Sequence, residues 1–163
     1  MTLREDALYA SYRRLERPLF NVLYRQLWQR EDCQDLIHDA YIRVWERRAK
    51  VDEATLDALV WTTALNLAHN RLRRRRLWRS EPMDDNLPTT AMSDQDFLAT
   101  RRLRAALGRL PAASRDVLLL SEFSGMRGHE IAALLRIPAG TVASRKHHAM
   151  AQLKALLRDI VDA

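Results

Sequence analysis

Hydrophobic residues recur along the first half of the chain with the spacing of helices. From residue 8 to residue 27, leucine and tyrosine return at steps of three and four, and Pro18 inside this run predicts either a kink or two shorter helices. Further helices are predicted over 30–48 and roughly 56–78. The positions predicted to face inward are Leu8, Tyr12, Leu15, Leu19, Leu23, Leu27, Ile37, Ala40, Tyr41, Val44, Val60, Ala64, Leu67, Ala68 and Leu72.

A polar segment separates this block from a second periodic one. Residues 79–96, RSEPMDDNLPTTAMSDQD, hold two prolines, five acidic residues and little apolar content, which is typical of a linker. The pattern therefore predicts an all-α chain of two small helical domains, 1–78 and 97–163, joined by the acidic flexible linker 79–96.

The second block has the pattern of a helix–turn–helix. A helix is expected to follow Pro111 and to end at Gly125, and HEIAALL predicts a short second helix. Pro138 cannot continue that helix, and Thr141 is a suitable N-cap for the next one. In such motifs the N-terminal half of the last helix enters the DNA major groove, although two helices packed without DNA are the plain alternative. The residues predicted to contact DNA here are Thr141, Ser144, Arg145, Lys146 and His148.

The charge of the chain points in the same direction. Lys and Arg outnumber Asp and Glu by 27 to 21 in 163 residues, and the net charge of +6 favours a polyanion, either nucleic acid or an anionic membrane surface. Six of the nine residues 71–79 are arginine, more than is needed to complement a helix C-terminus. Side-chain amides upstream can contact base edges, and Trp78 can stack on unpaired bases. The DNA-binding residues predicted in this helix are Asn66, Asn70, Arg71, Arg73, Arg74, Arg75 and Arg76.

Several classes of function are disfavoured by what the sequence lacks. The single cysteine, Cys33, excludes a disulfide framework and a cysteine-rich zinc site. No stretch approaches the roughly 18 apolar residues of a membrane span, so no membrane insertion is expected, and a cytoplasmic location is predicted. No glycine-rich phosphate loop, serine-centred elbow or Cys–His pair is found, so no catalytic residue, cofactor or metal is predicted.

Asp32, Asp35 and Asp39 form an acidic stripe at helical spacing, beside His38. A metal or hydrolase site is disfavoured because ligands from a second element are missing. Acids near a helix N-terminus are stabilised by the helix dipole, which accounts for the first two residues. Docking against a basic protein surface is the third interpretation of this stripe.

Three segments, in this order, resemble one family. DCQDLIHDAYIRVW and ALNLAHNRLRRRR resemble conserved region 2 of the extracytoplasmic-function group of bacterial RNA polymerase sigma factors. ALGRLPAASRDVLLLSEFSGMRGHEIAALLRIPAGTVASR resembles conserved region 4 of the same group. The resemblance covers nearly the whole chain, on both sides of the acidic segment.

The resemblance implies an alternative sigma factor without enzymatic activity of its own. Region 2 would dock on the clamp of the largest subunit of core RNA polymerase, and region 4 would contact the flap and read the minus-35 promoter element. The third helix and the loop near 51–58 would capture the melted promoter strand, with Asn66 beside a pocket for a flipped base. An anti-sigma factor would be a further partner. The residues assigned by resemblance to polymerase binding are Asp32, Asp35, Leu36 and Asp39.

The chain departs from the family pattern at several positions. Leu59 stands where relatives have tryptophan, and Arg127 replaces a serine that caps a helix. Arg136 replaces the glycine of the turn, which predicts backbone strain of about 1 kcal/mol if that residue is left-handed. Ala143 replaces a cation, and Lys146 falls on an apolar series. The DNA target therefore cannot be copied from relatives.

Two other functions are open from the sequence. A stand-alone helix-turn-helix regulator would share the second block and would not use polymerase as a partner. A metal-dependent nuclease would be built on the acidic stripe, and its cleavage of DNA would be abolished by a chelator.

Overall fold

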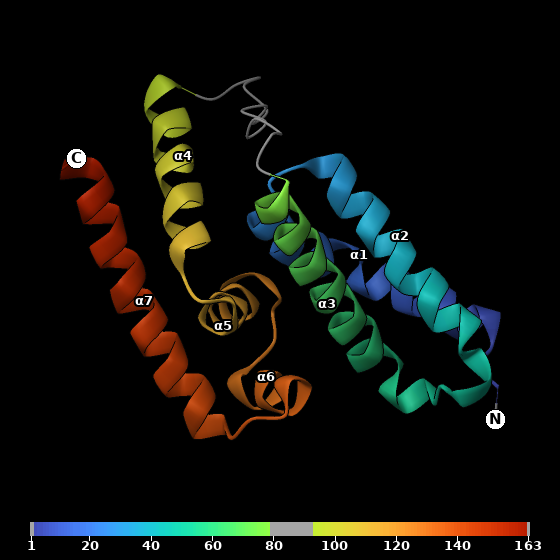
Figure 1. Ribbon diagram of the computed structural model, residues 1–163. Helices are drawn as coiled ribbons and strands as arrows, with labels where there is room; N and C mark the ends of the chain where they lie inside the picture. The colour runs from blue at the N-terminus through green and yellow to red at the C-terminus, as the bar shows by residue number, and fades with distance from the viewer. Residues whose placement is uncertain (1, 79–92, 163) are drawn as a thin grey trace. The chain divides into compact units, whose positions relative to one another are not determined.

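The computed structural model describes residues 2–78 and 93–162 and divides the chain into two compact units, Met1–Leu77 and Trp78–Ala163 (Figure 1). Most of the predicted linker, residues 79–92, lies outside the described residues. All regular elements in the described ranges are helices, which confirms the predicted all-α class. They are α1 (Glu5–Leu27), α2 (Arg30–Glu46), the short 3₁₀ turns η1 (Arg48–Lys50) and η2 (Glu53–Thr55), α3 (Leu56–Leu77), α4 (Asp94–Arg109), α5 (Ala112–Phe123), α6 (Gly128–Leu135) and α7 (Ala139–Asp162).

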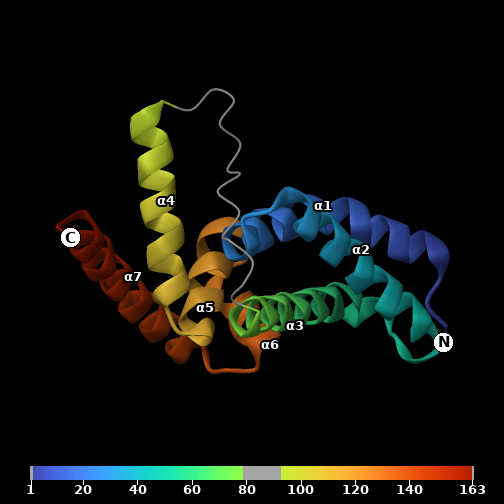
Figure 2. The same ribbon diagram turned by 45° about the horizontal axis from the view of Figure 1, so that its top comes forward.

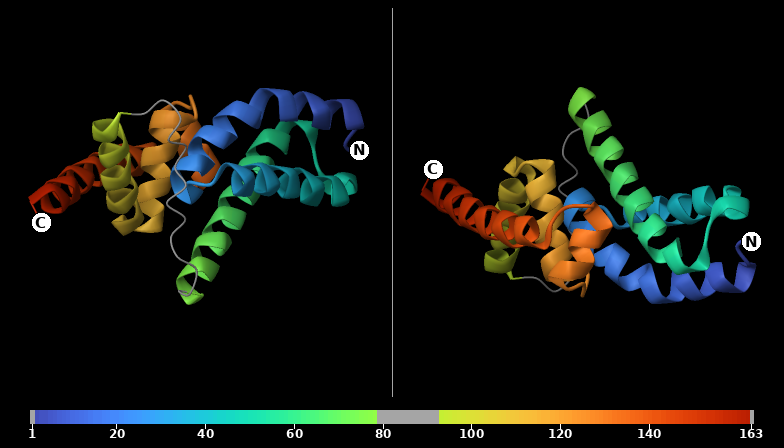
Figure 3. Two further views of the ribbon diagram at one scale, coloured as in Figure 1. Left: turned by 90° about the horizontal axis from the view of Figure 1, so that it is seen from above. Right: turned by 90° about the horizontal axis from the view of Figure 1, so that it is seen from below.

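The first unit is built from α1, α2 and α3, each of which packs on the other two (Figure 3). The predicted face of α2 is entirely buried, whereas Leu8 and Tyr12 of α1 and Leu67 and Leu72 of α3 are only half-buried. Pro18 lies within one helix, so the expectation of two shorter helices is wrong. The centre of the core is formed by Leu19, Val22, Leu23, Ala40, Val60 and Ala64, all 0% exposed.

A polar network joins the three helices at the N-terminal end of α3. The buried Ser11 hydroxyl of α1 donates to Asp57 Oδ1 at 2.7 Å and lies 3.0 Å from the Tyr41 hydroxyl of α2. Arg14 Nη2 donates to the same carboxylate at 3.1 Å. Burial is the main cause that raises the pKa of Tyr41 to about 12, so the phenol stays neutral. The network fixes where α3 begins relative to α1 and α2.

The second unit places α5 and α6 against α7, while α4 also packs along α7 (Figures 1 and 2). Helix α4 begins at Asp94 rather than at residue 97, because the Ser93 hydroxyl accepts from the Asp96 amide at 3.2 Å and caps it. Val117, Leu119, Leu120, Ile131 and Ala149, each at most 1% exposed, form the core.

The turn between α6 and α7 meets the condition under which backbone strain was expected at Arg136. Arg136 adopts the left-handed conformation, with φ 57° and ψ 46°, where the family pattern has glycine. Its exposed position lets the side chain lie in solvent, and the Ile137 amide donates to the Ala132 carbonyl at 3.1 Å. Left-handed backbone is unfavourable for a residue with a Cβ atom and carries no such penalty for glycine.

Arg136→Gly should therefore raise the free energy of unfolding of the second unit by about 1 kcal/mol. The measurement is thermal unfolding of the full chain followed by circular dichroism. Gly125→Ala is the matched control, because Gly125 has a φ of 79° and a Cβ there would meet nothing within 4 Å. It should lower stability through the backbone alone, and a lower melting temperature for Arg136→Gly would contradict the assignment.

Candidate nucleic-acid interface

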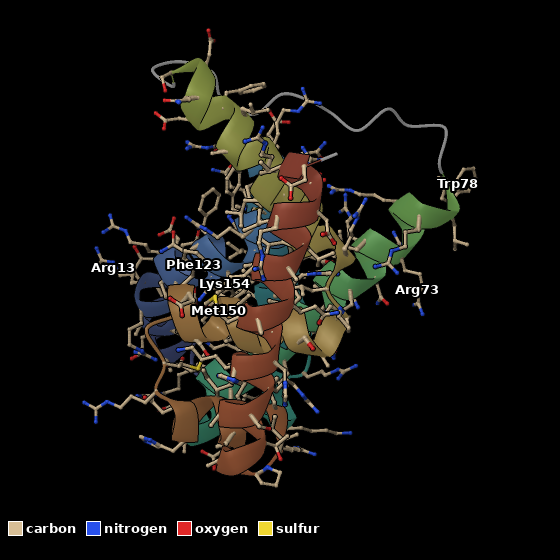
Figure 4. The ribbon with its side chains drawn as sticks, turned by 90° about the vertical axis from the view of Figure 1, so that its left-hand side faces the viewer. Arg13, Arg73, Trp78, Phe123, Met150 and Lys154 are labelled. Atoms are coloured by element: carbon tan, nitrogen blue, oxygen red, sulfur yellow. The ribbon has the colours of Figure 1, made fainter. Side chains whose placement is uncertain are left out.

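The last turns of α3 carry an exposed polar and basic surface. Asn66 and Asn70 are exposed, as are Arg73, Arg74 and Arg76, and Arg73 Nη2 donates to Asn70 Oδ1 at 2.8 Å. Figure 4 shows Arg73 and Trp78 projecting away from the end of this helix, where Trp78 is 70% exposed. The α3 surface offers amide groups and cations together, which suits a nucleic-acid strand.

Arg71 and Arg75 were predicted in the same DNA-binding set but face a different environment. Both form ion pairs with Asp32 of α2, Arg71 Nη1 at 3.3 Å from Asp32 Oδ1 and Arg75 Nη2 in closer contact with Oδ2. Arg75 also donates to the Leu27 carbonyl and to Gln29 Oε1, each at 2.9 Å. Their guanidinium groups thus join the end of α3 to the junction of α1 and α2.

Cys33 follows Asp32 on α2 and is fully buried. Burial is the main cause that raises the pKa of this thiol to about 12, the Asp32 carboxylate adds to the rise, and Arg75 opposes it. The thiol is protonated at neutral pH and therefore a poor nucleophile.

A groove of about 460 Å³ lies between α2 and α3 beside the exposed amides. Its wall combines apolar side chains, among them Ile42 and Leu59, with polar and charged ones. The polar and charged residues of the wall are Thr63, Asn66, Asn70, Asp39, Arg43, Glu46 and Arg47. Leu59, one of the departures from the family pattern, therefore contributes to this wall, and Ile42 is 56% exposed at its rim. Apolar side chains next to hydrogen-bonding amides are the chemistry that an unpaired base requires.

The four residues assigned to polymerase binding are not equivalent. Asp35 is exposed, Asp39 forms an ion pair with Arg43 at 3.4 Å, and Asp32 is held by the two arginines of α3. Leu36 is only 4% exposed because its side chain belongs to the core of the first unit, so it offers a partner little surface. Of the three acids, Asp35 and Asp39 have solvent-accessible carboxylates, and that of Asp39 is shared with Arg43. Within residues 2–78 and 93–162 no group of three or more His, Cys, Asp or Glu is placed to hold a metal ion.

The predicted recognition helix, α7, starts earlier than expected. It begins at Ala139, and the amides of Thr141 and Val142 donate to the Pro138 carbonyl, so Thr141 lies in the first turn and does not cap the helix. Gly140 is exposed, and a Cβ atom there would meet nothing within 4 Å, so a larger side chain at this position would not clash through its Cβ atom.

The predicted DNA-contacting side chains of α7 also differ in what holds them. Lys146 Nζ lies 3.4 Å from Glu122 Oε1 of α5, which is how a cation on the apolar series is accommodated. Ser144 and His148 are exposed, and the ring of His148 lies edge-on to that of His147. Arg145 is half-buried and makes no ion pair with the described residues. Of the two long cationic side chains here, Lys146 is paired with an acid, whereas Arg145 is not paired with any acid in the described part of the chain.

At the start of α6, the guanidinium of Arg127 has no acceptor with which to cap the helix, as the departure from serine predicted. The reciprocal half of a capping box is present, because the Arg127 amide donates to Glu130 Oε1 at 3.0 Å. The missing half reduces the stability of this helix end and leaves its geometry intact.

No helix in the described part of the chain is long and apolar enough to cross a membrane.

Comparison with known proteins agrees with this division into two units. Residues 11–77 match the family model for sigma-70 region 2, and residues 100–153 match the model for sigma-70 region 4. The RNA polymerase sigma-E factor of Streptomyces coelicolor is 31% identical over 154 residues, which cover 93% of this chain and 80% of that protein. The extracytoplasmic-function sigma factor SigE of Mycolicibacterium smegmatis is 30% identical over 146 residues, which cover 85% of this chain and 57% of that protein.

Two solved structures share the fold. CnrH, in complex with the cytosolic domain of CnrY, has a TM-score of 0.72 at 24% identity, covering 96% of this chain and 90% of that one. The sigma factor RpoE of Bartonella quintana, in complex with the anti-sigma factor NepR, has a TM-score of 0.60 at 21% identity, covering 93% and 92%. The chain belongs to the extracytoplasmic-function group of sigma-70-type RNA polymerase sigma factors.

Proposed function

We propose that this protein binds core RNA polymerase and directs it to a set of promoters, where it assists DNA melting and the initiation of transcription. The observation that carries the proposal is the pair of family matches in the order of regions 2 and 4, over two separately folded units. An exposed basic and amide-bearing surface on the first unit and a helix-turn-helix on the second support it.

We assign the two activities to different parts of the chain. Residues 1–78 would bind polymerase and the melted promoter element, residues 97–163 would read the minus-35 element, and residues 79–96 would connect them. The groove beside Asn66 is the proposed site for an extruded base, because extrusion costs a few kcal/mol that stacking and edge contacts must return. Arg73, Arg74 and Arg76 would follow the phosphates next to that base.

The remaining partners and the location belong to the same proposal. NepR is named as an anti-sigma factor in its complex with RpoE, and we extend to this chain an anti-sigma partner of its own. The protein would act in the cytoplasm, where polymerase and chromosome meet. It would contribute binding surfaces, and the chemistry of RNA synthesis would belong to the polymerase.

Run-off transcription tests this function directly. Core polymerase with the protein should transcribe a subset of fragmented genomic DNA, and sequencing of the transcript ends should reveal start sites that share two upstream elements. Core polymerase alone is the control. Transcripts identical with and without the protein would contradict the proposal, and tight operator binding by the free protein without core association would instead favour a stand-alone regulator.

Charge reversal on α2 tests polymerase docking by the acidic stripe. The double variant Asp35→Lys, Asp39→Lys should weaken binding to core polymerase, because two attractions to a basic surface become repulsions, while helicity should be unchanged. Single exposed ion pairs contribute only about 0–1 kcal/mol, so the double variant is the informative one. Affinity is measured by titrating labelled protein with core polymerase. The variant Glu46→Lys reverses one exposed charge at the end of the same helix, half the change of the double variant, and should bind nearly as tightly as wild type. Equal affinities for the double variant, Glu46→Lys and wild type would remove docking from this face.

A further inference from the structure

The arginines between residues 71 and 76 divide into two groups by their partners. Arg73, Arg74 and Arg76 are exposed, and within the described residues none of them pairs with an acid. Arg71 and Arg75, one turn apart on the other side of the helix, converge on Asp32. A basic run that looks uniform in sequence is therefore two surfaces in the fold.

Asp32 is placed to hold these two cations firmly. Its side chain is 22% exposed and those of Arg75 and Arg71 are 27% and 39% exposed, so solvent screens the pairs less than it would on an open surface. Asp32 lies in the first turn of α2, where the helix dipole also favours its negative charge.

Arg75 has a second reason to remain where it is. Its Nη1 donates to the carbonyl of Leu27, the last residue of α1, where helical carbonyls lack intrahelical partners. Its Nη2 also reaches Gln29 Oε1 in the connection to α2. Moving this guanidinium onto a phosphate would break these bonds and leave the Asp32 carboxylate without part of its compensation.

We propose that Asp32 masks Arg71 and Arg75 from nucleic acid, so that α3 presents three phosphate-binding arginines instead of five. The inference rests on the proposed function of α3 as a DNA-contacting helix. Each phosphate contact adds affinity for any sequence, so masking two of them limits binding to non-promoter DNA while leaving base contacts untouched. Asp32 is thus a positioning residue for promoter discrimination and does not itself contact DNA or a basic partner.

The test is the salt dependence of DNA binding by the complex with core polymerase, at saturating core, on a short duplex of mixed sequence. Asp32→Asn removes the charge that holds both arginines. It should steepen the plot of log affinity against log salt by roughly 0.9 to 1.8, corresponding to one or two added phosphate contacts, and should tighten binding at low salt. Glu31→Gln, the exposed neighbouring acid, removes the same charge without releasing an arginine and should keep the wild-type slope. Equal slopes for Asp32→Asn and Glu31→Gln would overturn the masking role.

Two further variants keep the inference testable if Asp32→Asn impairs folding. Arg71→Gln leaves the bonds of Arg75 in place and should retain the wild-type slope, whereas Arg74→Ala should lower it by about 0.9. A slope lowered equally by both variants would contradict masking. An unchanged slope for Arg74→Ala would mean that α3 does not bind DNA, so the proposed role of this helix would fail together with the masking inference. A slope reduced by Arg74→Ala but unchanged by Asp32→Asn would mean that only the masking inference fails.

Discussion

Replacing Arg145 by alanine is expected to reduce polymerase-dependent transcription from a mapped promoter by about 5- to 150-fold, the equivalent of roughly 1–3 kcal/mol. Arg145 lies one turn from Thr141 on α7 and makes no ion pair with the described residues, so its guanidinium is available to DNA. Lys146 is paired with Glu122, and Ala143 carries no charge, so Arg145 is expected to make the main cationic contact of this stretch with DNA.

The form of the loss identifies the contact. A bidentate bond to guanine should relax the preference at one base pair of the minus-35 element, whereas a phosphate contact should weaken all sequences evenly and lower the salt slope by about one. Lys154→Ala removes an exposed cation further along α7 and should have little effect (Figure 4). Core binding is measured separately, and wild-type transcription by Arg145→Ala across salt concentrations would show that α7 is not the recognition helix.

Arg115→Ala should destabilise the second unit by about 2–4 kcal/mol, because it removes a buried guanidinium bonded to the end of α4. Arg115 is 4% exposed and donates to the carbonyls of Leu107 at 2.9 Å, Leu110 at 2.8 Å and Gly108 at 3.4 Å. These carbonyls belong to the last turn and cap of α4, where helical carbonyls run short of intrahelical donors, although that of Leu107 also accepts the Leu110 amide at 3.2 Å. Alanine removes the guanidinium donor from all three carbonyls, and two of them, those of Leu107 and Leu110, belong to buried residues.

Urea unfolding of the full chain, followed by circular dichroism, measures this loss. Arg109→Ala removes the same charge from an exposed position in the last turn of α4 and should change stability by no more than about 0.5 kcal/mol. Arg115→Lys should fall between the two, because an ammonium group cannot reproduce the planar arrangement of donors. Equal losses for Arg115→Ala and Arg109→Ala would mean that the carbonyl bonds contribute nothing.

The periodicity of apolar residues predicted the helices well because burial of one helix face is a local property of sequence. Ile37, Ala40, Tyr41 and Val44 were predicted from their spacing, and all four are buried. Pro18 was harder, since a proline inside a helical pattern is compatible with a break or with continuation, and packing decides between them. For Arg136 the resemblance gave only a condition, strain if the residue is left-handed where relatives have glycine, and the structure meets that condition with a φ of 57°.

The partners of charged residues were the part that sequence reasoning missed. Asp32 and Arg75 lie on different helices, and nothing local distinguishes Asp32 from Asp35 or Arg75 from Arg74. Their separation into paired and exposed groups depends on how α2 and α3 cross, which a periodic pattern does not encode. Arg115 was missed for the same reason, because its role depends on the carbonyls of another helix. The signal available in the sequence was the position of Arg115 just before the apolar residues 117–120.

The polar bonds at both ends of α3 have a consequence for the thermodynamics of strand capture. Ser11 and Asp57 fix one end of the helix, and Asp32 and Arg75 fix the other. The surface proposed to bind the strand, around Asn66, is therefore ordered in the free protein, and the loss of conformational entropy on association would fall on the single strand. A protein segment that folded on binding would add a large negative heat-capacity change to the binding of the strand. Because α3 is already held in place, the heat-capacity change should reflect only the surface buried between the helix and the strand.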